Sequence, residues 1–151
     1  MKPLRRSKPV AFWYHLVLDF AMVISSNTFR AFKTAGFAKT AKKARISDKA
    51  LCETLQQVWA GKADDLGGGV YKKRLNDNRH RSIILAKGAR YWIYEYLFAK
   101  QDRSNIDEDE LMAFRLLAKS YAGLTAPQVS QLLAGGDFVE ICHGDETKIQ
   151  K

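Results

Sequence analysis

The stretch that decides the fold is VYKKRLNDNRHRSIILAKGARYWIYEYLF, residues 70–98. Three segments within it are rich in the β-branched and aromatic residues that favour strands, at 70–75, 81–86 and 90–98. Lys87-Gly88 lies between the last two and is a two-residue hairpin signal, because glycine accepts positive φ. The stretch therefore predicts neighbouring antiparallel strands.

A two-residue hairpin also predicts the register of its strands. It pairs Ile83 with Trp92, Arg81 with Tyr94 and His80 with Glu95. Since directly paired residues share a face, Arg81, Trp92 and Tyr94 are expected to project together, and His80 and Glu95 oppositely. Alternation places Lys72 and Arg74 on one face of their strand and Lys73 on the other.

Upstream of this stretch, the pattern predicts a first strand over Thr28–Lys33 and a short basic helix over Phe37–Ala44. Ser47 is a good N-cap for a second helix, which Gly61 ends at a position suited to a left-handed cap. Residues 64–69, DDLGGG, are interpreted as a turn whose glycines give backbone freedom beside a close approach. They do not form a phosphate loop, because no GK[ST] follows.

Downstream, Asp107 can cap a third helix whose first turn carries Glu108, Asp109 and Glu110, charges that complement the helix dipole. Residues 125–128 resemble a capping box that opens a fourth helix ending near Gly135-Gly136. Residues 138–142 could supply a last strand. The expected architecture is α+β, a single domain in which helices pack against an antiparallel sheet.

The charge is high and unevenly distributed. The 151 residues carry 25 Lys and Arg against 16 Asp and Glu, a net charge of +9. Residues 28–105 hold 17 bases and 7 acids, whereas residues 106–151 hold 4 bases and 8 acids. A basic middle of this kind favours a polyanionic partner, because clustered cations release counterions from phosphates. A merely soluble basic surface is the simpler alternative.

The two cysteines and three histidines predict no metal site. Cys52 lies on the apolar side of a predicted helix and is interpreted as a small core residue, and Cys142 is far from it in sequence. No CxxC and no Cys/His cluster is present, so neither zinc nor a cofactor is expected. Two reduced thiols fit a cytoplasmic protein.

The first 27 residues imitate a secretory signal, with a basic start and an apolar run. His15 and Asp19 interrupt that run, residues 25–27 lack a clear cleavage pattern, and the run is too short to span a membrane. Translation from Met22 is a further possibility. We expect residues 1–27 to be an extension outside the core, residues 28–143 to be the domain and residues 144–151 a tail.

Cations concentrate on and around the predicted strands. At three consecutive positions, 72–74, they replace the β-branched and aromatic residues that strands favour. A solvated basic face is one interpretation, and an RNA-cleaving site is another. In such a site the 2′-OH attacks the adjacent phosphate, which needs a base and cations around the developing phosphorane. A lysine among cations has a lowered pKa, and arginine suits phosphate.

Several segments together resemble the RelE-like toxins of bacterial toxin–antitoxin systems, in a branch that includes HigB-like proteins. The segments are FRAFKT, ISDKALCETLQQV, ADDLGGGVYKKRL, HRSIILAKGARYWIYEYLFAKQDRSNI and ELMAFRLLAKSYAGLT. The resemblance runs from about Thr28 to His143 and implies a compact antiparallel sheet flanked by helices. It implies cleavage of mRNA in the ribosomal A site, with no metal, and neutralisation by a cognate antitoxin protein.

The resemblance also implies the site. The candidate catalytic residues are Lys72 as the base, Arg74 and Arg81 as phosphate ligands, and Lys100 and Arg103 as backbone ligands or proton donors. The candidate RNA-binding residues are Lys73, Arg79, His80, Arg90 and Tyr94, although pairing with Glu95 is the favoured role of His80.

The chain departs from well-studied members at two places. Gln101 stands where they carry an Arg, and Ile106-Asp107 occupies the region where many carry a Tyr. Either change could weaken cleavage or pass part of the chemistry to Arg103 or His80. A gyrase-targeting toxin of the ParE type and a non-catalytic nucleic-acid-binding module remain the alternatives to a ribosome-dependent nuclease.

Overall fold

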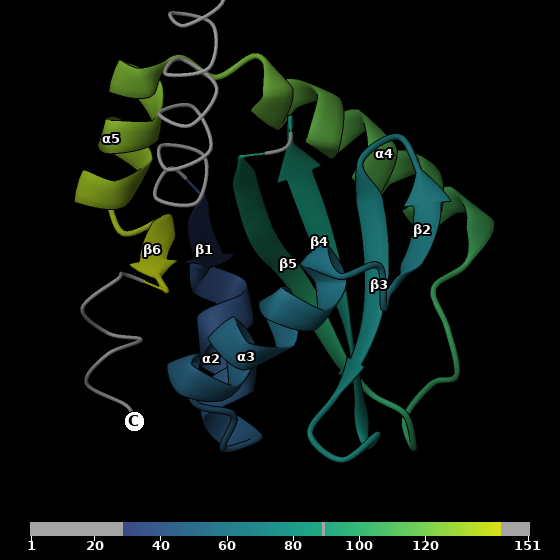
Figure 1. Cartoon of the computed structure of the whole chain (residues 1–151). Helices are drawn as coiled ribbons and strands as arrows, with labels where there is room; N and C mark the ends of the chain where they lie inside the picture. The colour runs from purple at the N-terminus through teal and green to yellow at the C-terminus, as the bar shows by residue number, and fades with distance from the viewer. Residues whose placement is uncertain (1–28, 89, 143–151) are drawn as a thin grey trace, which may run out of the picture.

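The computed structural model describes residues 29–88 and 90–142, so the predicted extension at 1–27 and the predicted tail at 144–151 lie outside it. One six-stranded sheet carries helices on both faces (Figure 1). In chain order the elements are β1 (Arg30–Thr34), α2 (Ala35–Lys43), α3 (Asp48–Trp59), β2 (Asp64–Gly67), β3 (Val70–Leu75), β4 (His80–Lys87), β5 (Tyr91–Ala99), α4 (Glu108–Ala122), α5 (Ala126–Ala134) and β6 (Phe138–Ile141).

The predicted helices form, and local capping explains where they begin. The Ser47 side chain accepts the Ala50 N–H at 3.1 Å at the start of α3. Reciprocal capping boxes open α4, between Asp107 and Glu110, and α5, between Thr125 and Gln128. Gly61, with φ +87°, ends α3 as predicted. Across the described residues, no helix is long and apolar enough to cross a membrane.

The sheet order is β2-β3-β4-β5-β1-β6, which confirms the α+β class. It is mostly antiparallel, but β1 pairs parallel with β5, so the sheet is mixed. The interpretation of residues 64–69 as a turn alone is wrong, because Asp64 pairs with Lys72 and Asp65 with Tyr71 to make the edge strand β2. Two aspartates and a glycine run gave no propensity signal for that strand.

The glycine run does permit a close approach, as predicted. Gly68 has φ +65°, and a Cβ there would lie 2.9 Å from Cγ of Arg115 on α4. The Arg115 guanidinium donates to the Leu66 carbonyl oxygen, so α4 lies directly against β2. The helix is thereby held over the face of β3 and β4 that carries the candidate site.

The predicted register of β4 and β5 is wrong. Lys87 pairs with Tyr91, so residues 88–90 form the connection, and a bulge then shifts the register between Ile83, which pairs with Tyr96, and Ile84, which pairs with Tyr94. Arg81 consequently faces Phe98 and not Tyr94. A hairpin signal of two residues did not reveal the longer connection or the extra residue in β5.

The sheet divides the core into two layers. Ala31, Leu75, Ile84, Trp92 and Tyr94 pack against α2 and α3. Val70, Ile83, Leu85 and Phe98 pack against α4 on the other face, where a further cluster joins α5 to β1, β5 and β6. The bulge lies beside a half-buried polar contact, in which Tyr121 of α4 donates to the Glu95 carboxylate at 2.7 Å. Burial raises the pKa of Glu95 above its ordinary value, although that hydrogen bond opposes the effect.

The expectation of two reduced thiols is wrong in this structure. Cys52 in α3 and Cys142 after β6 form a disulfide, with their Cα atoms 5.3 Å apart. Cys52 does belong to the core, as predicted. The pairing could not be inferred from sequence because 90 residues separate the two cysteines, and only the placement of β6 beside β1 brings Cys142 to α3.

We predict that reduction of this disulfide lowers the free energy of unfolding by about 2–4 kcal/mol, because the crosslink restricts the unfolded chain. Urea unfolding of the wild-type protein with and without dithiothreitol measures the difference. The double variant Cys52→Ala/Cys142→Ala is the control and should not respond to dithiothreitol. Equal midpoints for oxidised and reduced wild type would contradict the prediction.

Candidate functional site

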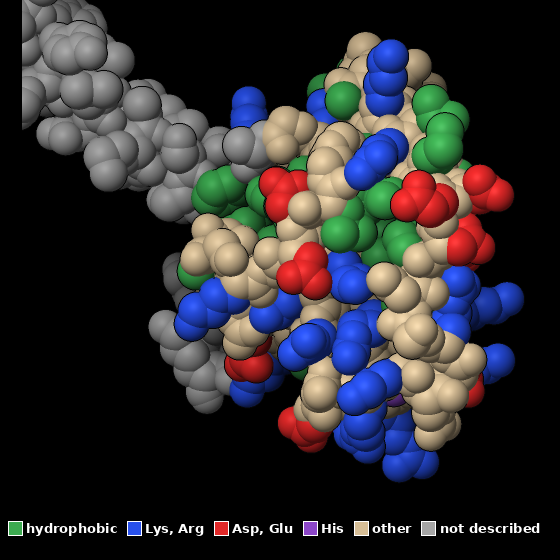
Figure 2. All heavy atoms as spheres, turned by 90° about the vertical axis from the view of Figure 1, so that its right-hand side faces the viewer, with side chains coloured by type: hydrophobic (Ala, Val, Ile, Leu, Met, Phe, Trp, Pro, Cys, Tyr) green, Lys and Arg blue, Asp and Glu red, His purple; other side chains and the backbone are tan. Residues whose placement is uncertain are grey.

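Three predicted site residues lie together on the α4 face of the sheet. β3 pairs with β4 so that Lys72 faces Ile83 and Arg74 faces Arg81 directly. Lys72 and Arg74 alternate with Lys73, which lies on the opposite face, as predicted. Figure 2 shows Lys and Arg side chains gathered over the lower half of the face formed by β2, β3 and α4, with most of the acidic ones at its margins.

Arg81 is nearly buried, with 8% of its surface exposed. Its Nη1 donates to the carbonyl oxygens of Asn78, at 3.1 Å, and His80, at 3.2 Å. The turn that supplies the first of these carbonyls has three successive residues with positive φ, Asn76, Asp77 and Asn78. Burial desolvates the Arg81 charge, and among the described residues no carboxylate pairs with it.

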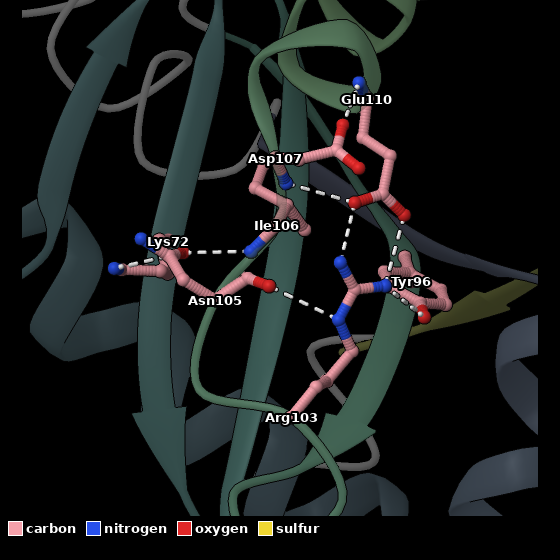
Figure 3. Close-up of polar contacts among 7 residues, drawn as sticks. All are labelled: Lys72, Tyr96, Arg103, Asn105, Ile106, Asp107 and Glu110. Atoms are coloured by element: carbon pink, nitrogen blue, oxygen red, sulfur yellow. Dashed lines mark hydrogen bonds and ion pairs between the residues drawn. The ribbon is translucent and has the colours of Figure 1, made fainter.

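Lys72 is oriented by a residue that sequence analysis missed. Its Nζ donates to Oδ1 of Asn105 at 3.2 Å, and the same oxygen accepts the Ile106 N–H at 2.9 Å (Figure 3). Asp64 is the nearest carboxylate, 4.0 Å from the Lys72 ammonium, and is largely exposed. A single asparagine in a polar loop carries no sequence signal for this role, because the contact joins segments 33 residues apart.

Arg103 fastens the segment that holds Asn105. Its guanidinium binds both carboxylate oxygens of Glu110, at 2.9 and 2.5 Å, and donates to the Tyr96 hydroxyl at 3.2 Å and the Asn105 carbonyl at 3.0 Å (Figure 3). The hydrogen bond from Arg103 holds the pKa of Glu110 below its ordinary value. Because its donors are engaged, Arg103 positions the loop and is not placed to bind phosphate directly.

Lys100, Arg79 and His80 line a separate hollow of about 660 Å³ at the end of the sheet. His80 faces Ala99 and contacts Asn76, with 3.0 Å between its Nδ1 and the Asn76 amide nitrogen. The predicted pairing of His80 with Glu95 is therefore wrong. The longer connection between β4 and β5 shifts the register by three residues and the bulge by one more, and Glu95 instead accepts a hydrogen bond from Tyr121.

Two predicted RNA-binding residues lie elsewhere. Tyr94 is fully buried, and its hydroxyl donates to the Leu51 carbonyl at 2.7 Å, so its predicted place on an RNA-binding surface is wrong. Arg90 is exposed in the β4–β5 connection, at the opposite end of β4 from Arg81. Lys73 is adjacent to the site in sequence but lies on the opposite face of the sheet, where its Nζ donates to the Lys62 carbonyl at 2.7 Å.

A family model described as the RelE toxin of the RelE/RelB toxin–antitoxin system matches residues 29–141. The chain belongs to the RelE toxin family. Membership in this family implies a RelB-type antitoxin as partner. No curated protein and no solved structure matches this chain.

We predict that the imidazole of His80 in this RelE toxin is neutral at pH 7. Partial burial lowers its pKa below 6.5, and the charge of Arg79 lowers it further, while Asp102 acts in the opposite direction. Titration of the His80 ring protons by NMR should give a midpoint below 6.5, and Arg79→Ala should raise that midpoint. A wild-type midpoint above 6.5, or no change in the variant, would contradict this assignment.

Proposed function

We propose that this RelE-family toxin is a ribosome-dependent mRNA endonuclease that inhibits translation in the cytoplasm. The observation that carries the proposal is the direct pairing of Arg74 with Arg81 across β3 and β4. Like charges placed directly opposite destabilise a sheet. An anion bound between the two guanidinium groups would offset that cost, and a phosphodiester has the charge and geometry that arginine recognises.

The proposed reaction is attack of the ribose 2′-oxygen on the adjacent phosphorus, with departure of the 5′-oxygen. Lys72 would take the proton from the 2′-OH, since it lies on the same face of the sheet as Arg74 and Arg81 and Asn105 orients its Nζ. Arg74 and Arg81 would bind the phosphate and stabilise the charge of the phosphorane. The 2′,3′-cyclic phosphate and a protonated 5′-hydroxyl are the products, and the requirement for the 2′-OH explains selectivity for RNA.

Residues around this centre would bind the rest of the strand. Lys100, Arg79 and His80 line the separate hollow at the end of the sheet and are our candidates to hold flanking backbone. We propose that Lys100, exposed at the end of β5, also supplies the proton to the leaving oxygen. The RelB-type antitoxin would act by covering this basic face with acidic or amphipathic chain.

We predict that Arg81→Ala and Lys72→Ala each lower mRNA cleavage by at least about a hundredfold, as expected when a transition-state ligand or a proton acceptor is lost. The measurement is primer extension on a defined mRNA in a cell-free translation reaction, with and without ribosomes. Lys119→Ala is the charge-matched control, because Lys119 is exposed near the end of α4.

The same reaction separates the alternatives. Translation that stops while mRNA stays intact would sink the nuclease mechanism, and impaired DNA supercoiling would then favour a gyrase-targeting toxin. RNA affinity that falls equally in Arg81→Ala and Lys119→Ala would favour a non-catalytic binding module.

We further predict that Asn105→Ala slows cleavage about two- to tenfold and alters its pH profile, because Lys72 loses the hydrogen bond that orients it. The measurement is the single-turnover rate on stalled ribosomes between about pH 6 and pH 9. Asn105→Asp retains an acceptor oxygen but adds a negative charge beside Lys72, so it should recover part of the rate only toward the upper end of that pH range. A wild-type rate and pH profile in Asn105→Ala would show that Asn105 does not position Lys72.

A further inference from the structure

A cluster of aromatic side chains at the end of α3 is not used by the proposed reaction. Trp59 and Phe29 are each 36% exposed and stack with ring centroids 4.8 Å apart and planes at 19°. The edge of this pair meets Trp92, whose centroid is 6.3 Å from that of Trp59, and Trp92 in turn packs on Tyr71. These four side chains line a groove of about 380 Å³, within the range of sites that hold small ligands.

The aromatic groove continues into a basic one. A second hollow of about 390 Å³ shares Gly61 and Ala63 with it, and its lining also includes Asp64 and four cations: Lys62, Lys72, Lys73 and Arg74. Burial lowers the pKa of Lys73, and the charges of Lys62 and Arg74 lower it further, so an anion placed here would relieve repulsion among cations. Lys72 and Arg74 also belong to the proposed reaction centre, which joins that centre to the groove.

One polar atom in this cluster has no partner. Within the described residues, Nε1 of Trp92 is buried and makes no hydrogen bond, although Trp92 lines the groove. Buried indole N–H groups usually find an acceptor.

We propose that this groove binds a nucleotide of single-stranded RNA outside the reaction centre, with its base on Trp59 and Phe29 and its phosphate at Lys62 and Lys73. Aromatic platforms next to cations are how proteins hold single strands, because every base has a face that can stack. Asp64 and Asp65 lie at the groove, but the Asp65 carboxylate accepts the Gly67 N–H at 2.9 Å. This inference rests on the proposed function, whose substrate it extends by one subsite.

The test is the affinity of the full chain for a fluorescein-labelled hexauridine with 2′-O-methyl riboses, which cannot be cleaved, measured by anisotropy without ribosomes. Trp59→Ala should raise the Kd about tenfold, as expected for loss of one stacked base. Trp59→Phe should recover most of the affinity, and Lys62→Ala should reduce the salt dependence of binding. Met112→Ala is the control, since Met112 is 58% exposed on α4, away from the groove.

Photocrosslinking keeps the inference falsifiable if Trp59→Ala unfolds. Wild-type protein with a 5-iodouridine version of the same oligonucleotide should crosslink at Phe29, Trp59 or Tyr71. Unchanged affinity in a folded Trp59→Ala, or crosslinks confined to other residues, would overturn it. So would unchanged RNA binding with weakened antitoxin binding, which would make the groove a protein interface. These experiments measure binding and not cleavage. If the groove binds RNA but the protein does not cleave mRNA, the proposed function is wrong and this inference still holds.

Discussion

Two arginines held opposite each other on one face of β3 and β4 are the constraint on which the rest of this site depends. Arg74 and Arg81 repel, and Arg81 is also withdrawn from water. The structure supports that arrangement with carbonyl oxygens, which lower the cost of burying a guanidinium without neutralising it. Carboxylates would stabilise the fold more, but they would also occupy the place of a phosphate.

Acidic side chains are used nearby, one segment away from the arginine pair. Glu110 neutralises Arg103 and caps α4, so one carboxylate closes the loop and starts the helix. The loop then presents Asn105, which is neutral, to Lys72. A neutral acceptor orients an amine without adding the negative charge that would favour its protonated form. Between Arg103 and Glu110, the residue that contacts Lys72 is therefore neutral, and the carboxylate nearest to the ammonium is that of Asp64 on β2, 4.0 Å away.

Local signals predicted most of the fold because they act over a few residues. Ser47, Asp107 and Thr125 cap helices where capping chemistry says they should, and alternation placed Lys72 and Arg74 on one face of β3. Apart from the length of the β4–β5 connection, the errors required information from distant parts of the chain. The bulge in β5, the edge strand β2 and the Cys52–Cys142 disulfide depend on which segments the folded sheet brings together. Tyr94 was misplaced for the same reason, since a shifted register moves a side chain to the other face.

The shape of β3 links the reaction face to the aromatic groove behind it. β2 pairs with β3 only as far as Lys72, so within the described residues the outer edge of Lys73 and Arg74 has no neighbouring strand. Alternation then sends consecutive cations to opposite faces of an open edge, with Arg74 toward the reaction centre and Lys73 toward α3. A central strand has a neighbouring strand paired along each of its edges. Its cations could not form a connected row of charge from one face of the sheet to the other. Three consecutive cations are poor strand formers, yet at this open edge they would give the proposed RNA substrate a continuous row of positive charge from one face of the sheet to the other.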